Sequence, residues 1–166
     1  MANYYPLALE NEWHYKQPDG GVYTKRVICA SGNQFTIHNS SSDTCSIIKT
    51  DGHLITTDVL EPGNFQPWLT CNLSKGDNWV VKFKVSGLHC ICMLIMTVRE
   101  TGINKEVEGK VYNNVVFIEA ENKIVVNDGF ISLNSFTQYY YAENIGLILT
   151  TSSAGDDHAL VACTLK

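Results

Sequence analysis

The longest apolar passage of the chain runs from Trp79 to Thr101 and constrains the fold more than any other stretch. Its first arm places Trp79, Val81 and Phe83 at every second position. Side chains of a β-strand alternate between its two faces, so this period predicts a strand with one buried and one solvated face. Ser86-Gly87 then predicts a turn, because glycine adopts positive φ without a steric penalty. The passage is therefore predicted to be the central hairpin of an antiparallel sheet.

The second arm of this passage, residues 88–98, is apolar on both faces. This pattern predicts a strand that is covered on each side, and a buried helix is the alternative. Gly87 and Gly102 bracket the run, and no helix-capping residue with an apolar stripe of helical spacing follows, so a strand is favoured. A transmembrane helix would need roughly 20 consecutive apolar residues, which this run does not reach.

The rest of the chain alternates short strand-like segments with turn-rich separators such as Gln17 to Gly21 and Asp51-Gly52. This spacing is typical of an all-β meander, barrel or sandwich. We therefore predict a single β domain, residues 1–166, built as an antiparallel meander, half-barrel, barrel or curved sheet. Strands are predicted at 22–29, 34–39, 44–50, 53–60, 106–111, 115–120, 130–142, 145–151 and 158–165, with a bend at 113–114 and an extended piece at 68–71 inside a crossing loop at 61–75.

Composition excludes some functions. The 166 residues carry a net charge of −5, and Lys25-Arg26 is the only adjacent basic pair, so nucleic-acid binding is not expected. The amino-terminal residues lack the pattern of a signal peptide. The protein is therefore expected to be cytoplasmic as the sequence stands, or to belong to the bacterial cell envelope if an export signal was removed. No phosphate loop, calcium loop or dinucleotide motif is found, and no cofactor is predicted.

Several short motifs are similar to those of a known group of proteins. Tyr5-Pro6-Leu7 with Trp13-x-Tyr15, the segment 108–116 (EGKVYNNVV), and Tyr140-Tyr141-Ala142 with the segment 145–148 (IGLI) carry the likeness. Together they resemble a group of uncharacterised bacterial β-rich proteins, many of them exported or lipoprotein-like. This resemblance implies a curved antiparallel sheet or half-barrel and implies no enzyme activity. The chain departs from the pattern at Glu10, where glycine is usual, and residues 22–60 are unmatched.

Two clusters have side chains that could support chemistry. Cys90 and Cys92 lie on one face of a predicted strand, where they could be buried thiols, a redox pair or part of a metal site. A structural zinc site needs four ligands, and the sequence has no second pair of suitable spacing, so buried thiols are favoured. Asp156-Asp157-His158 has the residue types of a hydrolytic relay but lies in a turn-like segment, where a solvated loop is favoured. No catalytic residue and no metal site are predicted.

Tyr139, Tyr140 and Tyr141 form a run in which the first and third share one face of a strand. Tyrosine combines a large contact area with a polar hydroxyl, so this face suits either core packing or a hydrophobic ligand. We predict Tyr139, Tyr141, Trp68 and Trp79 as ligand-binding residues of a non-enzymatic binding or structural domain. The alternatives are a homo-oligomeric assembly protein that pairs through sheet edges or the tyrosine face, and a thiol or metal enzyme at Cys90 and Cys92.

Overall fold

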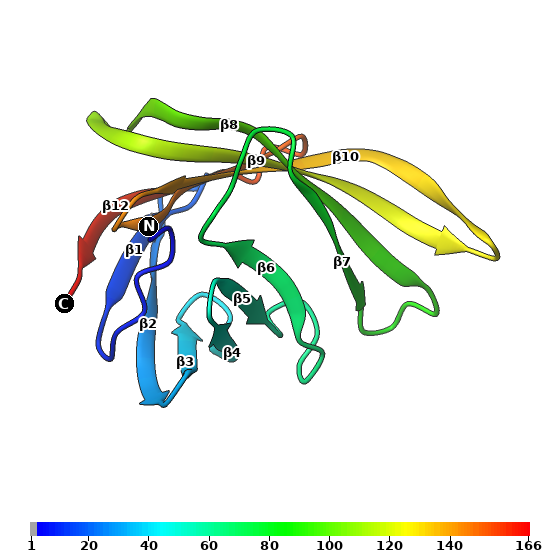
Figure 1. Ribbon diagram of the computed structural model, residues 1–166, viewed down its shortest axis with the longest axis horizontal. Helices are drawn as coiled ribbons and strands as arrows, with labels where there is room; N and C mark the ends of the chain where they lie inside the picture. Colours follow the sequence, from blue (N-terminus) through cyan, green and yellow to red (C-terminus); the bar gives the residue numbers. More distant parts are fainter. Residues whose placement is uncertain (1–2) are drawn as a thin grey trace.

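The computed structural model describes residues 3–166, and within this range the chain forms strands and turns but no helix (Figure 1). Residues 3–166 accordingly contain no helix that is long and apolar enough to cross a membrane. The predicted all-β class is confirmed. The strands are β1 (Glu12–Lys16), β2 (Val22–Ser31), β3 (Gln34–Asn39), β4 (Thr44–Asp51), β5 (Leu54–Thr57), β6 (Gln66–Thr70), β7 (Asn78–Lys84), β8 (Ile91–Val107), β9 (Lys110–Val126), β10 (Gly129–Ala142), β11 (Gly146–Ser152) and β12 (His158–Thr164).

All twelve strands belong to one antiparallel sheet in the order β6-β5-β4-β3-β2-β1-β12-β11-β10-β9-β8-β7. The two halves of the chain are therefore two meanders, and they join where β12 pairs with β1. The sheet curls so that its two edge strands, β6 and β7, return toward each other (Figure 1). The result is a nearly closed barrel, which lies within the predicted range of curved-sheet and barrel forms.

The seam between β6 and β7 is bridged by side chains instead of a backbone ladder. Gln66 accepts a hydrogen bond from the backbone N–H of Lys82 at 3.0 Å, and Glu61 accepts one from that of Lys84 at 2.9 Å. The amide of Asn64 donates to the carbonyl of Lys82 at 3.1 Å. Pro67, which cannot donate to a ladder, lies in the edge strand β6. The predicted crossing loop therefore contains a complete edge strand.

The hairpin predicted from Trp79 onward is formed, since β7 and β8 pair antiparallel from Asn78–Thr97 to Lys84–Ile91. Its predicted position was wrong, because β7 lies at the edge of the sheet and the two terminal strands occupy the middle. The apolar outer face of β8 has a local explanation. Met93 is buried there between its cross-strand neighbours Lys82 and Lys123, and lysine stems can cover apolar surface.

The predicted strand at 106–111 and bend at 113–114 were also wrong. The chain reverses at Glu108-Gly109, where φ is +49° and +76°, as in the two-residue turns favoured in hairpins. Asn114, with φ of +52°, lies inside β9, and Gly102, with φ of +68°, lies inside β8. The β8–β9 register shifts near Gly102, so this glycine marks a bulge within a longer strand.

Candidate ligand-binding cavity

The inward faces of the strands line a cavity of about 460 Å³ that opens to solvent at its rim. This volume falls within the range of roughly 300–1,000 Å³ that is usual for small-molecule sites. Aromatic and aliphatic side chains form its inner wall, and polar or exposed residues form its rim. Wall residues are Tyr5, Tyr23, Ile37, Ile48, Trp68, Tyr139, Tyr141 and Leu147, and rim residues include Asn39, Thr44, Ser46, Thr137, Ser152 and Asp156.

Three of the four predicted ligand-binding residues meet on one wall of this cavity. The indole Nε1 of Trp68 donates a hydrogen bond to the hydroxyl of Tyr141 at 2.8 Å. The Tyr139 ring meets the Trp68 ring edge to face, with centroids 5.6 Å apart. Tyr139 and Tyr141 therefore share the inward face, as their spacing predicted. Tyr140 points outward, where its ring stacks on Phe117 at 4.7 Å.

Trp79, the fourth predicted residue, lies apart from this group. It lines a separate hollow of about 280 Å³ between β6 and β7, together with Leu54, Leu69 and Leu73. Its indole Nε1 is buried and has no hydrogen-bond partner among residues 3–166. The alternation along the strand predicted that Trp79 points inward. It did not show that Trp79 would line a hollow separate from the one lined by Trp68, Tyr139 and Tyr141.

Burial controls the acidity of the tyrosines on the cavity wall. It raises the pKa of Tyr139 to about 12, and it raises the pKa of Tyr141 well above the ordinary value. Burial is also the main reason that the pKa of Tyr23 rises to about 12, with a further contribution from the charge of Asp156. These hydroxyls therefore remain neutral near pH 7 and can act as hydrogen-bond donors.

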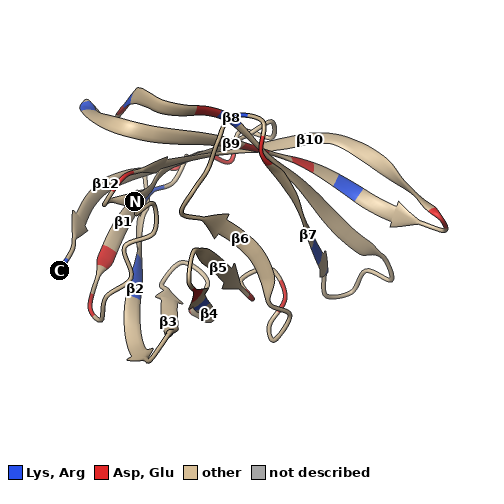
Figure 2. Ribbon diagram, in the orientation of Figure 1, with Lys and Arg blue, Asp and Glu red and all other residues tan. Residues whose placement is uncertain are grey.

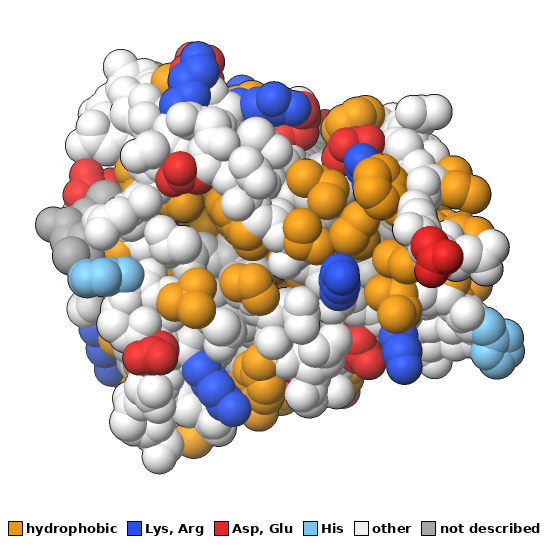
Figure 3. Space-filling view, turned by 45° about the vertical axis from the view of Figure 1, so that its right-hand side comes forward, with side chains coloured by type: hydrophobic (Ala, Val, Ile, Leu, Met, Phe, Trp, Pro, Cys, Tyr) orange, Lys and Arg blue, Asp and Glu red, His pale blue; other side chains and the backbone are white. Residues whose placement is uncertain are grey.

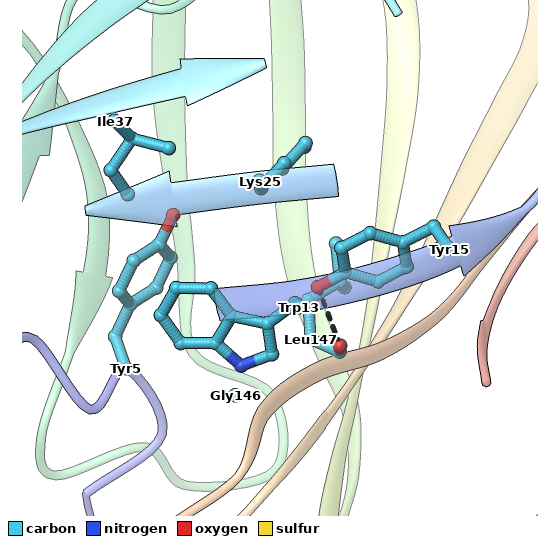
Figure 4. Close-up of a pocket in the computed structure, with 7 residues that line it drawn as sticks. All are labelled: Tyr5, Trp13, Tyr15, Lys25, Ile37, Gly146 and Leu147. Atoms are coloured by element: carbon cyan, nitrogen blue, oxygen red, sulfur yellow. Dashed lines mark hydrogen bonds between the residues drawn. The ribbon is translucent and has the colours of Figure 1, made fainter. Parts of the chain in front are cut away.

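A lysine projects into the same interior. Tyr23, Lys25 and Val27 alternate with outward residues along β2, so Lys25 occupies an inward position beside Trp13 of β1. Lys25 lines both the cavity and a small adjoining recess of about 20 Å³, which it shares with Tyr5, Trp13 and Gly146 (Figure 4). Burial lowers the pKa of Lys25. Sequence reasoning did not identify Tyr5, Tyr23 and Lys25 as cavity residues. The alternation along β2 places Lys25 on the same face as Tyr23 and Val27, but only the pairing with Trp13 and Tyr15 of β1 shows that this face is the inner one.

Asp156 and His158, the residues considered above for a hydrolytic relay, are in contact at the rim of the cavity, and Tyr23 contacts His158 there. His158 Nε2 lies 3.0 Å from Asp156 Oδ1, and His158 Nδ1 lies 2.8 Å from the Tyr23 hydroxyl. A nucleophile needs a lowered pKa or a strong adjacent base. The raised pKa of Tyr23 disfavours its phenolate, so this chain of contacts fits a structural tie between β2 and β12 better than a catalytic centre.

All six cysteines are thiols in the structure. Burial, followed by the neighbouring Cys90, raises the pKa of the Cys92 thiol. A reactive cysteine needs the opposite shift, so the structure gives no support to a thiol enzyme at this pair. Among residues 3–166, no group of three or more His, Cys, Asp or Glu side chains is arranged to hold a metal ion.

The outer surface carries few concentrated charges. Lysines, arginines and carboxylates are spread over several strands and turns (Figure 2). Hydrophobic side chains gather on the side of the molecule that Figure 3 brings forward. Exposed apolar residues at the ends of the β7–β10 strands include Val85, Leu88, Phe130, Ile131 and Leu133.

The fold and the cavity define an all-β protein in which two antiparallel meanders form one sheet that curls around a cavity. No protein-family model matches the sequence, and no curated protein matches it. A solved structure from Bacteroides fragilis NCTC 9343, a protein inferred to be exported that has a YmcC-like fold, is similar over 99% of this chain and 100% of its own, with a TM-score of 0.59 and 10% identity. A protein from Parabacteroides distasonis ATCC 8503, inferred to be a lipoprotein, is similar over 98% of this chain and 99% of its own, with a TM-score of 0.49 and 12% identity. The Bacteroides fragilis comparison establishes a shared fold.

Proposed function

We propose that residues 1–166 form one non-enzymatic binding domain that holds an apolar or amphipathic small molecule inside the barrel. The cavity of about 460 Å³ carries this proposal, because Trp68, Tyr139 and Tyr141 supply aromatic contact surface on one wall. Ligand sites are usually concave and mostly apolar, with a few placed polar groups. Tyr139 and Tyr141 line this space, and their hydroxyls can supply such groups.

Binding of the neutral, apolar dye Nile red tests the proposal. Wild-type protein is expected to bind the dye saturably, with a blue shift of its emission. Thr137→Trp fills the cavity from β10 and is expected to weaken binding at least tenfold. Thr24→Trp places the same change on the outward face of β2 and is expected to bind like wild type. Absence of saturable binding by folded wild-type protein, or equal binding by all three proteins, contradicts the proposal.

We place this domain in the bacterial cell envelope. The support is that the Bacteroides fragilis protein with the same fold is inferred to be exported. The sequence motifs at both ends of the chain resemble bacterial proteins of exported and lipoprotein type. Fractionation of the source bacterium with an antibody against the domain tests the location. Detection in the cytosolic fraction alone contradicts it.

Self-association through the tyrosine face or the sheet edges has weaker support. Tyr139 and Tyr141 turn into the cavity, and Tyr140 is nearly covered on the outside. The backbone amides of Lys82 and Lys84 at the edge of β7 are already hydrogen-bonded to side chains of the facing edge. The cavity is therefore the better-supported site.

A further inference from the structure

Lys25 is a cation on the inward face of the barrel without an anionic partner. Its neighbour Arg26 points outward, where its Nε lies 3.8 Å from Glu12. Within residues 3–166, Lys25 forms no ion pair and no side-chain hydrogen bond. Its one charge-related contact is with the Tyr15 ring, whose centroid lies 5.7 Å from Nζ. This distance is near the limit of roughly 6 Å for a cation–π contact. A partly buried charge without a partner is costly, so this position calls for an anion.

The carboxylates that line the cavity are occupied elsewhere. Asp58 accepts hydrogen bonds from the backbone N–H groups of Ile47 at 2.6 Å and Gly63 at 3.0 Å. Asp156 pairs with His158 at 3.0 Å. Both carboxylates therefore stabilise their own loops through local contacts, and neither is paired with Lys25. The described residues therefore offer Lys25 no counter-charge.

The interior near Lys25 offers a hydrogen-bond donor. The Tyr5 hydroxyl makes no hydrogen bond within residues 3–166, and Tyr5 lines the recess that Lys25 also lines. Burial raises the pKa of Tyr5, so its hydroxyl keeps its proton. A lysine ammonium and a phenol hydroxyl form a donor pair that suits an oxygen anion.

The recess beside Lys25 measures about 20 Å³, and a single water needs about 10–15 Å³ of such space. The recess can therefore take one oxygen of an anionic group. Lys25 also lines the cavity of about 460 Å³, so the rest of a small head group such as a carboxylate can lie there. The larger cavity beyond, with Trp68 and Tyr141 on its wall, can take an apolar body.

We propose that the ligand is a carboxylate-bearing amphiphile, with its carboxylate against Lys25 and Tyr5 and its hydrocarbon part along Trp68, Tyr139 and Tyr141. This inference rests on the proposed function, since it names the chemical class that the same cavity would hold. It assigns Lys25 as the residue that selects an acid over a neutral molecule of equal size.

Displacement of Nile red by three ligands of matched chain length tests this assignment. Decanoate, decanol and decyltrimethylammonium share a ten-carbon chain and differ in the charge of the head group. Wild-type protein is expected to bind decanoate at least tenfold more tightly than decanol, and to bind the cation most weakly. Lys25→Met keeps the length of the side chain and removes its charge, and is expected to abolish the preference for decanoate. Arg26→Met, the matched change on the outward face, is expected to retain it.

The outcomes separate the two proposals. If Nile red binds but decanoate and decanol compete equally in wild type, the assignment of an acid ligand is wrong and the cavity proposal stands. If Lys25→Met keeps the wild-type preference, Lys25 is not the selecting residue and the assignment is again wrong. If Nile red does not bind to folded wild type, the proposed function itself fails. The comparison within wild type remains decisive even if Lys25→Met does not fold.

Discussion

The indole Nε1 of Trp13 donates a hydrogen bond of 2.7 Å to the carbonyl oxygen of Ile145, which lies 132 residues later in the chain. Two residues further along on each side, the Tyr15 hydroxyl donates to the carbonyl of Leu147 at 2.9 Å. Ile145 lies just before β11, and among the described residues β12 pairs with β11 only at Leu149 and Thr150. The carbonyls of Ile145 and Leu147 therefore need other donors. The Trp-x-Tyr motif of β1 provides them and ties β1 to the start of β11.

Replacing Tyr15 by phenylalanine should show how much its hydrogen bond to Leu147 contributes to stability. The change removes one hydroxyl and leaves the Leu147 carbonyl in the interior without its donor. A buried polar group without a partner costs about 1–3 kcal/mol, so the free energy of unfolding should fall by that amount in urea denaturation. Tyr140→Phe removes a hydroxyl that makes no hydrogen bond within residues 3–166 and should change stability by less than about 0.5 kcal/mol. Equal losses in the two variants would contradict this role of Tyr15.

Gly146 should be intolerant of alanine for two reasons. Its φ is +100°, a conformation that side-chain-bearing residues adopt with strain of about 1–3 kcal/mol. A Cβ atom there would also lie 3.3 Å from Trp13 Nε1, the donor of the bond to Ile145. Gly20→Ala is the matched control, because its φ is +86° and no atom lies within 4 Å of the added Cβ. Thermal unfolding should show a larger loss for Gly146→Ala than for Gly20→Ala, and similar losses would show that the contact with Trp13 is unimportant.

The sequence predicted most strand positions because burial on one face imposes a period of two. It also paired Tyr139 with Tyr141 on one face, which the structure confirms. It could not predict that β12 returns to β1, because strand order depends on contacts between distant segments. That closure moved the Trp79 hairpin from the expected centre to the edge. Glycine in the sequence does not distinguish a turn from a bulge, because both need positive φ. Gly102 marks a bulge inside a strand, whereas Gly109 marks a turn.

The same limit applies to the cavity. Trp68 and Tyr141 are 73 residues apart, and their hydrogen bond depends on the curvature of the whole sheet. Trp79 resembled Trp68 in the sequence, because both are aromatic residues in apolar strands. The two face different hollows because Trp68 lies on one face of β6, whereas Pro67 and Leu69 on the opposite face line the hollow of Trp79. Lys25 was noticed as part of a basic pair, but its inward direction emerges only once Trp13 and Tyr15 fix the inner face of β1.

The seam between β6 and β7 should weaken in acid. Glu61 accepts hydrogen bonds from the Asn64 side chain at 2.7 Å and the Lys84 backbone at 2.9 Å, and these lower its pKa below the ordinary 4.5. A carboxyl whose pKa is lower in the folded state stabilises the fold above its unfolded pKa, and this stabilisation is lost as pH falls through the folded pKa. The urea midpoint of wild type should therefore fall more steeply below pH 4.5 than that of Glu61→Gln.

Glu106→Gln is the control for the seam, because Glu106 has no ion pair or side-chain hydrogen bond within residues 3–166. Its urea midpoint should follow that of wild type through the acid range. Parallel curves for wild type and Glu61→Gln would show that the carboxylate at the seam does not contribute to the acid sensitivity of the fold.

The tyrosines should make the protein sensitive to alkali. The chain has eight tyrosines, and burial raises the pKa of every one of them in the folded state. For Tyr23 and Tyr139 the value is about 12, against an ordinary 10.0. The unfolded chain therefore releases these protons first as pH rises. The resulting stabilisation of the fold is complete below about pH 10 and is lost between about pH 10 and pH 12.

Absorbance at 295 nm, which reports phenolate, should show this shift directly. The native protein should titrate above pH 10, and the same chain in concentrated urea should titrate near pH 10. Tyr139→Phe should remove one tyrosine from the late part of the native curve and reduce the loss of stability between pH 10 and pH 12. Because Tyr139 lines the cavity, a native curve with its main step near pH 10 would show that Tyr139 is not buried, and would contradict the packed aromatic wall on which the proposed binding depends.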